Sequence, residues 1–139
     1  MAVQRTLCIV KPDAVEAGRT GAILARLSEE GFRVLGMRQL RLTRAQTEGF
    51  YAVHRGRGFF DELCDYMARS PVVAVALERE NAVQHYRDVI GATDPVKAAP
   101  GTIRKLYGKS VGENAVHGSD SEENGRIECS FFFAGYELV

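Results

Sequence analysis

Two short runs of consecutive apolar residues constrain the fold of this chain more than any other feature of its sequence. Residues 6–10 are rich in β-branched side chains, and Val72 to Leu77 is the longest uninterrupted apolar run. Neither run approaches the roughly 18 residues that a membrane span requires. Short apolar runs between turn residues are typical of strands buried on both faces. They therefore predict two central strands, the first ending at Lys11-Pro12 because proline cannot continue a hydrogen-bonded ladder.

The rest of the chain alternates between helical and strand patterns. We expect helices at 18–30, from 43 onward, around 60–67 and at 81–91, and further strands at 33–42 and 128–135. Helices are indicated by apolar spacing, by the capping box of Thr43 and Gln46 and by glycines at helix ends. This order predicts an α+β fold with the βαββαβ pattern of an antiparallel sheet covered by helices, to which extra helices are added.

Composition and charge exclude several classes of protein. A chain of 139 residues is typical of one domain, which we expect to span residues 1–139. Hydrophobic residues make up 45% and charged residues 26%, which excludes a disordered chain. Basic and acidic residues number 18 each, so the net charge is zero. This balance argues against a nucleic-acid-binding or membrane-surface protein that works through bulk charge.

The cysteines and the N-terminal sequence indicate a cytoplasmic protein. Cys8, Cys64 and Cys129 are too few and too scattered for a disulfide framework or a thiolate metal site. The first residues lack the charged and then apolar layout of a signal peptide. A reducing cytoplasm is the compartment that we expect from both features.

The segment from Thr93 to Gly118 is the least regular part of the chain. It contains Pro95, Pro100, four glycines and several basic residues. Irregular segments of this length in compact domains are usually functional. We therefore expect a long functional loop near residues 93–118.

The end of this loop has a pattern that points to histidine chemistry, Asn114-Ala115-Val116-His117-Gly118-Ser119-Asp120. Ser119 and Asp120 are residue types that cap a following helix, and the free N–H groups of such a helix attract anions. A carboxylate can hold one imidazole nitrogen and leave the other nucleophilic. The downstream candidates for this role are Glu122, Glu123 and Glu128. From these residues alone, a reactive histidine and an ordinary turn with a surface histidine stay equally open.

Basic and aromatic residues elsewhere add the ingredients of a nucleotide site. Lys11 stands at a strand end, and Arg87 and Arg104 offer planar guanidinium groups that suit phosphate. Phe59 offers a ring on which a base can stack. Each cation taken alone is better explained as a solvated surface residue. Phe59 is explained less well than Phe60 as a core residue, which slightly favours a role for it outside the core. The histidines do not have the spacing of a zinc site.

Three motifs together resemble those of a known family. Residues 6–13, Thr-Leu-Cys-Ile-Val-Lys-Pro-Asp, closely resemble the opening strand and Lys-Pro-Asp motif of nucleoside diphosphate kinases. Residues 100–104 and 114–121 resemble that family's loop and its active-site histidine signature. The match runs from about Thr6 to Phe133 in the same order and covers nearly the whole chain.

This resemblance implies a phosphotransferase with a ping-pong mechanism. A nucleoside triphosphate, typically ATP, phosphorylates His117, and the phosphohistidine then phosphorylates a nucleoside diphosphate. The resemblance also implies a ferredoxin-like fold, Mg²⁺ carried on the nucleotide phosphates rather than held by protein ligands, and a homo-oligomer of four or six chains.

The resemblance also assigns residues to roles. It implies phosphate and sugar contacts, some of them catalytic, from Lys11, Tyr51, Arg87, Thr93, Arg104 and Asn114. It implies a base cleft formed by Phe59, Leu63 and Val111. It implies that Ser119 and Glu128 support the histidine.

Other functions stay open on the sequence alone. One is a nucleotide-binding sensor without turnover, since a fold does not prove a function; the presence of His117 together with Lys11 argues against it. Another is nucleic-acid binding through Arg55 and Arg57, against which the balanced charge argues. One departure from the family pattern is Gly58, which stands where many relatives have proline, and we expect it to loosen the nucleotide clamp.

Overall fold

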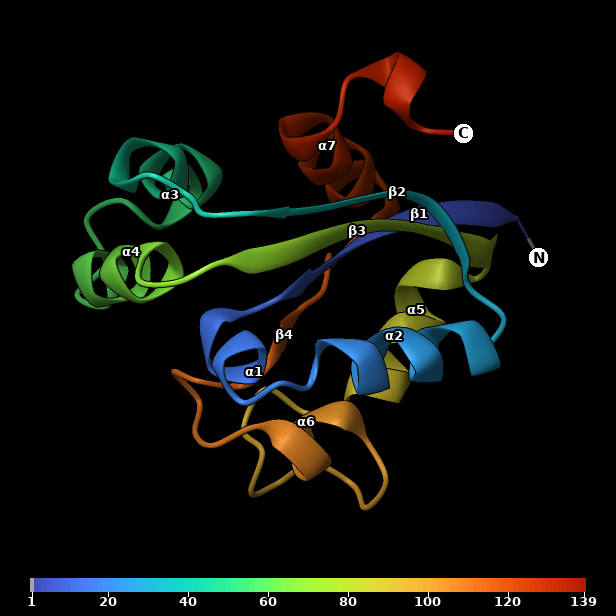
Figure 1. Cartoon of the computed structure of the whole chain (residues 1–139), viewed down its shortest axis with the longest axis horizontal. Helices are drawn as coiled ribbons and strands as arrows, with labels where there is room; N and C mark the ends of the chain where they lie inside the picture. Colours follow the sequence, from blue (N-terminus) through green and yellow to red (C-terminus); the bar gives the residue numbers. More distant parts are fainter. Residues whose placement is uncertain (1) are drawn as a thin grey trace.

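The computed structural model describes residues 2–139, which are built around a four-stranded antiparallel sheet in the order β2-β3-β1-β4 (Figure 1). The strands are β1 (Val3–Val10), β2 (Arg33–Leu40), β3 (Val72–Glu80) and β4 (Val116–His117). The apolar runs of the sequence form β1 and β3, which pair along their length from Val3 opposite Glu80 to Val10 opposite Val73. The expected α+β fold with an antiparallel sheet is confirmed.

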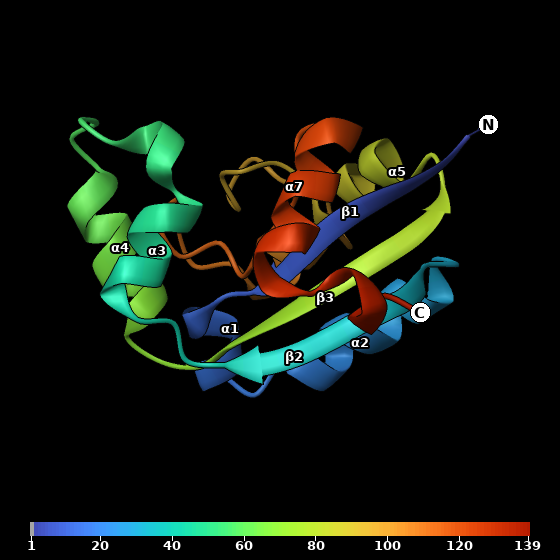
Figure 2. The ribbon, with the colours of Figure 1, turned by 90° about the horizontal axis from the view of Figure 1, so that it is seen from above.

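Helices cover both faces of this sheet. Those on one face are α1 (Pro12–Glu16), α2 (Thr20–Glu29), α5 (Ala82–Ile90) and α6 (Ile103–Tyr107). Helix α7 (Glu122–Phe132) lies across the other face (Figure 2). Helices α3 (Arg44–Phe50) and α4 (Phe60–Ala68) stand side by side at one end of the sheet and are joined by the 3₁₀ turn η1 (Ala52–His54). A second 3₁₀ turn, η2 (Gly135–Glu137), follows α7. None of the helices within residues 2–139 has the length and apolarity that crossing a membrane demands.

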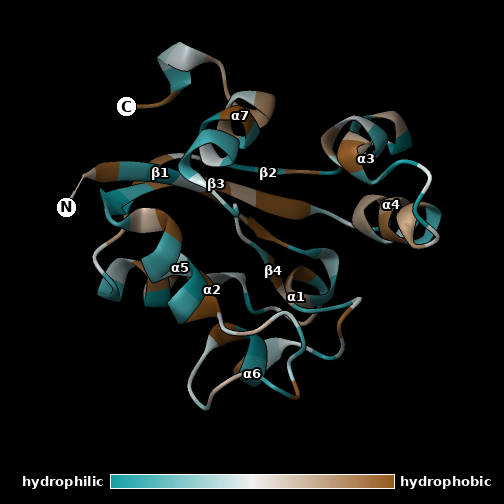
Figure 3. Ribbon diagram, turned by 180° about the vertical axis from the view of Figure 1, so that it is seen from behind, coloured by the Kyte–Doolittle hydropathy of each residue, from teal (hydrophilic) through white to brown (hydrophobic). Residues whose placement is uncertain are grey.

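The side chains on the two faces of β1 pack into two different hydrophobic clusters. Cys8 and Val10 pack with the apolar side chains of α2 and α5 on one face, and Leu7 and Ile9 pack with those of α4 and α7 on the other. Successive residues of a strand point to opposite faces, so a central strand needs apolar residues at every position. Figure 3 shows the matching hydrophobic stretch along β3.

The prediction for the last element was wrong. Residues 128–135 were expected to form a strand, but Glu128 lies in α7, and the fourth strand is β4, which pairs with the end of β1. The aromatic run from Phe131 to Phe133 suits a strand, but the helix is specified by its start and its packing. Ser121 accepts a hydrogen bond from the backbone N of Asn124 at 3.1 Å and begins the helix. The βαββαβ order is kept, with β4 in the last place.

Other local predictions were partly right. The capping box at Thr43 and Gln46 is present, and Gly91 ends α5 with a φ of +88°. Ser121 caps α7, so the expectation that Ser119 and Asp120 would cap the following helix was wrong. The loop near 93–118 contains α6 and β4 and is therefore more regular than expected.

Candidate active site

The topology brings His117 beside the end of the first strand. In the β1–β4 ladder His117 is opposite Ile9, and the backbone N of Lys11 donates to the carbonyl of Ala115 at 2.8 Å. Lys11 lies just beyond the last residue of β1, so it stands at the same end of the sheet as the histidine. Two residues more than 100 positions apart in the sequence thus share one end of the sheet.

One nitrogen of the His117 ring is held by the protein. Nε2 lies 2.7 Å from Oε1 of Glu128, and the same oxygen accepts from Oγ of Ser119 at 2.7 Å. Ser119 is fixed in turn by the backbone N of Leu7, which donates to Oγ at 3.1 Å. A carboxylate at Nε2 favours the tautomer in which Nε2 carries the proton and Nδ1 keeps the lone pair. The arrangement therefore leaves Nδ1 as the nucleophilic nitrogen.

Two aromatic residues that the sequence reasoning did not place in the site fix the rest of the histidine. The Phe50 ring meets the His117 ring edge-on, with centroids 5.4 Å apart. Tyr86 donates from its hydroxyl to the carbonyl of His117 at 2.6 Å and packs so closely on Gly118 that a Cβ there would lie 2.7 Å from its ring. The sequence placed Tyr86 on the inward face of its helix, but periodicity does not reveal a hydrogen bond to a distant backbone carbonyl.

Lys11 and Arg104 present positive charge next to the histidine. Lys11 Nζ donates to Oδ1 of Asn114 at 2.9 Å, and the Asn114 amide donates to the carbonyl of Thr93 at 3.1 Å. Arg104 donates to the carbonyls of Gly91 at 3.1 Å and of Val116 at 2.9 Å. Within residues 2–139 neither cation forms a salt bridge, so both charges are available to an anionic ligand.

The surroundings of Lys11 and Arg104 lower the pKa values of both side chains, so an anionic ligand would stabilise their charged forms. Burial, with Arg104 nearby, lowers the pKa of Lys11 to about 8. Burial also lowers the pKa of Arg104 below its ordinary value. Its Nε is buried and has no partner among the described residues. Phosphate groups, which are anionic and rich in acceptors, are the ligands that satisfy such a pair.

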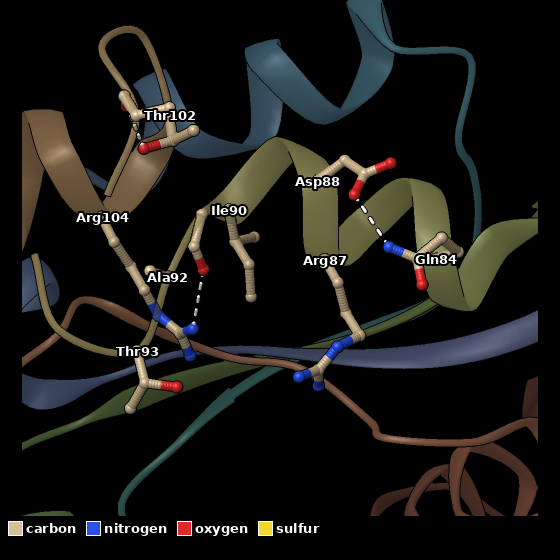
Figure 4. A pocket seen from close by; sticks show the side chains of 10 residues that line it. Gln84, Arg87, Asp88, Ile90, Ala92, Thr93, Thr102 and Arg104 are labelled. Carbon is tan, nitrogen blue, oxygen red and sulfur yellow. Dashed lines mark hydrogen bonds between the residues drawn. The ribbon is translucent and has the colours of Figure 1, made fainter. Parts of the chain in front are cut away.

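A small pocket of about 400 Å³ is lined by Arg104 and by a second arginine, Arg87 (Figure 4). Arg87, from the last turn of α5, and Arg104, from α6, extend their guanidinium groups to the same side as Thr93. Two arginines and a hydroxyl around one pocket are the donor set expected for phosphate.

A larger cleft of about 900 Å³ opens between α4 and the loop that precedes Asn114. Phe59 and Leu63 line it from the α4 side, Val111 lines it from the loop, and Thr93 belongs to both pockets. Phe59 and Val111 are about half exposed, at 47% and 57%, so both leave apolar surface on the walls of the cleft. The cleft therefore suits a flat, partly apolar ring.

Most of the residues singled out in the sequence are brought together, and one is placed differently. Around His117 or along the pockets lie Lys11, Phe59, Leu63, Arg87, Thr93, Arg104, Val111, Asn114, Ser119 and Glu128. Tyr51 lines neither pocket but lies close to the histidine: it packs on Phe50, and burial, with the charge of Glu128 nearby, raises the pKa of its hydroxyl, which lacks a partner among the described residues. At Gly58 a Cβ meets open space.

Comparisons with known proteins point in one direction. Residues 4–138 match the family model described as nucleoside diphosphate kinase. The chain is 64% identical over 139 residues to a nucleoside diphosphate kinase of Sorangium cellulosum, covering 100% of this chain and 96% of the relative. It is 50% identical to one of Persephonella marina, covering 100% of this chain and 99% of the relative.

Two solved structures of nucleoside diphosphate kinases are also similar to this chain. The Aquifex aeolicus nucleoside diphosphate kinase superposes with a TM-score of 0.97 at 47% identity, covering 99% of this chain and 100% of that one. A nucleoside diphosphate kinase of Halobacterium salinarum, solved in complex with CDP, gives a TM-score of 0.95 at 38% identity, covering 99% and 92%.

Proposed function

Because the chain belongs to the nucleoside diphosphate kinase family, we propose that His117 carries the phosphoryl group between its two nucleotide substrates. The chain is a phosphotransferase that moves the γ-phosphate of a nucleoside triphosphate to a nucleoside diphosphate. The observation that carries the proposal for His117 is its hydrogen bond to Glu128 at Nε2, which leaves Nδ1 as the nucleophilic nitrogen, on a segment whose residues 114 and 116 hold Lys11 and Arg104.

The reaction proceeds in two displacements at the same nitrogen. The Nδ1 lone pair attacks the γ-phosphorus, the bond from that phosphorus to the β–γ bridging oxygen breaks, and the nucleoside diphosphate leaves with the bonding electrons. A terminal oxygen of the second diphosphate then attacks the phosphohistidine, and the P–N bond breaks back to Nδ1. Glu128 accepts from Nε2–H and stabilises the positive charge of the ring while the phosphoryl group is attached.

The basic side chains supply most of the electrostatic stabilisation. Phosphoryl transfer depends on positioning and charge neutralisation more than on covalent assistance. Lys11 and Arg104 are held by carbonyl and amide oxygens and not by carboxylates, so no salt bridge within the described residues competes with phosphate for them. Arg87 and Thr93 extend the same set along the small pocket.

The larger cleft takes the base. Stacking on Phe59 with Leu63 and Val111 around the ring asks only for a π-face, so it tolerates every common base. This accounts for a substrate class that includes purine and pyrimidine nucleotides.

We expect Mg²⁺ to enter on the nucleotide phosphates. Within residues 2–139 no group of three or more histidine, cysteine, aspartate or glutamate side chains is arranged to hold a metal ion, whereas the pockets supply donors suited to phosphate oxygens. Mg²⁺ usually binds through phosphates and water in such sites, and it neutralises charge on the transferred group.

Three further expectations go with this function. We expect the chain to act as one domain over residues 1–139, supported by a family match that spans 4–138. We expect a homo-oligomer, supported by β2, whose outer edge exposes Val34 and Met37. We expect a cytoplasmic location, supported by three buried free cysteines.

Steady-state kinetics test the central role of His117. With MgATP and a second diphosphate varied together, a ping-pong enzyme gives parallel double-reciprocal lines. We expect parallel lines for the natural chain, and loss of turnover in His117→Ala with binding of MgADP retained. Intersecting lines, or substantial turnover in His117→Ala, would rule out the phosphohistidine route. Binding of MgADP without turnover in the natural chain would favour the alternative function, a nucleotide-binding sensor.

A further inference from the structure

A buried carboxylate that the reaction does not use directly lies behind the histidine segment. Asp13 is 1% exposed and lines neither the small pocket nor the base cleft. Its Oδ2 accepts a hydrogen bond from the backbone N of Ala115 at 3.1 Å, and its Oδ1 accepts from the hydroxyl of Tyr66. Buried carboxylates are costly unless fully hydrogen-bonded, so this arrangement calls for a role.

The backbone that Asp13 contacts has an unusual conformation. Ala115 has a φ of +75°, one of two positive values among the non-glycine residues described. A residue with a Cβ avoids this region and persists there only when its surroundings hold it. Its carbonyl is held by Lys11 and its N–H by Asp13, so both sides of the residue are fixed.

This conformation sets the direction of the catalytic segment. Asn114, which precedes Ala115, holds Lys11 Nζ, and Val116, which follows, holds Arg104 through its carbonyl. His117 comes next. A change of the Ala115 dihedral angles therefore shifts the nucleophile and the contacts of both cations together.

Tyr66 connects this arrangement to the base cleft. Its hydroxyl fixes the second oxygen of Asp13, and its ring lies under the Arg69 guanidinium at 5.0 Å and lines the cleft on the α4 side. Burial, together with the hydrogen bond to Asp13, raises the pKa of this hydroxyl, so it stays a donor at neutral pH.

We propose that Asp13 is a positioning residue that, with Tyr66, holds Ala115 in its left-handed conformation and so orients His117 for phosphoryl transfer. The proposal rests on the proposed role of His117. It concerns a residue that touches neither phosphate nor base, so it makes a different prediction from that of a binding residue.

Tyr66→Phe tests this with little change in packing, because the ring remains and only the hydroxyl is lost. The measurements are the rate constant for labelling of His117 at saturating MgATP, by rapid quench, and the Kd of MgADP, by calorimetry. We expect the rate constant to fall about tenfold, the effect of losing one hydrogen bond to a charged group, with the Kd of MgADP within about twofold of the natural value. Tyr136→Phe, at an exposed tyrosine, controls for the substitution itself.

A second substitution separates positioning from a general structural role. Glycine adopts positive φ without penalty, so Ala115→Gly relieves the strain that Asp13 and Tyr66 hold. We expect the double variant Tyr66→Phe/Ala115→Gly to recover most of the lost rate.

Three results would overturn the proposal: a natural rate in Tyr66→Phe, a loss that Ala115→Gly does not relieve, or equal losses in rate and MgADP affinity, which would make Tyr66 only a wall of the cleft. Absence of label in the natural chain would instead count against the role of His117.

Discussion

Lys11 differs from an ordinary surface lysine because it is partly buried and lies beside Arg104. These two causes, burial first, lower its pKa to about 8. Between about pH 8 and 10.5, the unfolded chain therefore binds more protons at this residue than the folded chain does. The contribution of Lys11 to the free energy of unfolding accordingly rises with pH across this window, while its positive charge in the folded enzyme is lost.

The same pKa predicts the pH dependence of the reaction. We expect kcat/KM, which reports the free enzyme, to fall above about pH 8 as Lys11 loses its proton. Bound phosphate stabilises the ammonium, so the fall in kcat begins at a higher pH. In Lys11→Arg the guanidinium stays charged, and we expect the alkaline fall in kcat/KM to disappear, at a lower absolute rate. A pH profile that is identical in Lys11→Arg would assign the ionisation to another group.

Helix α7 brings Glu128 to the histidine, and a glycine allows it to do so. At Gly125 a Cβ would collide with the backbone carbonyl of Arg5 on β1, so the helix lies directly on the strand. The two elements are in extensive contact. One turn further along α7, Glu128 reaches His117. The position of the catalytic ring therefore depends on a close approach between a helix and a strand.

Gly125→Ala is expected to weaken both packing and catalysis. Overpacking of this kind costs about 1–3 kcal/mol in the free energy of unfolding, and a displaced α7 moves Glu128 away from His117, lowering kcat. Gly21→Ala in α2 is the matched control, since its Cβ meets open space; we expect it to stabilise by about 0.5–1 kcal/mol without changing kcat. Urea unfolding and steady-state assays measure both. A Gly125→Ala enzyme as stable and active as the natural chain would contradict this account of α7.

Sequence patterns predicted the elements that have strong local signals. The central strands, α2, α4 and α5 follow from apolar runs, helical spacing and caps. Strand β4 has two residues, which are too few to show any periodicity. It forms because Val116 and His117 pair with the end of β1. A helix was expected to follow Ser119 and Asp120, but the C-terminal half of α7 was predicted as a strand because the run from Phe131 to Phe133 favours a strand locally, whereas packing on β1 decided the outcome.

The site residues followed from motifs more than from physical pattern. His117, Lys11 and Arg104 were singled out as residue types that suit phosphate, and the structure gathers them. The contributions of Phe50, Tyr86 and Asp13 to the site were not predicted, because they depend on contacts between residues that are far apart in the sequence. The spacing of residues in the sequence does not predict such long-range contacts.

In the molecule as a whole, β2 forms one edge of the sheet and, within residues 2–139, has no second strand beside it. Besides its ladder with β3, the Leu35 carbonyl accepts a hydrogen bond from the backbone N of Val139 at 3.1 Å. Among the described residues β2 pairs with β3 alone, and its exposed side chains include Val34 at 42% and Met37 at 56% exposure. Open apolar edges invite pairing with another chain unless they are covered. This edge is the surface that we expect to be buried in a homo-oligomer.

Light scattering coupled to size-exclusion chromatography tests that assembly. We expect a mass of several chains for the natural protein at micromolar concentration, and a smaller species for Met37→Lys, because a charge on an edge strand opposes pairing. Val53→Lys, at a side chain 83% exposed on η1, controls for the added charge. A monomeric natural protein, or unaltered assembly in Met37→Lys, would refute the role given to β2.

Transfer of a labelled phosphoryl group through His117 is the decisive measurement for this mechanism. The purified protein is mixed with Mg²⁺ and γ-labelled ATP, and then chased with unlabelled GDP, CDP or UDP. We expect an acid-labile, alkali-stable phosphoprotein, labelled at His117, whose label passes to each diphosphate, and no labelling of His117→Ala. Label on another residue, or transfer between nucleotides without a labelled protein, would contradict it.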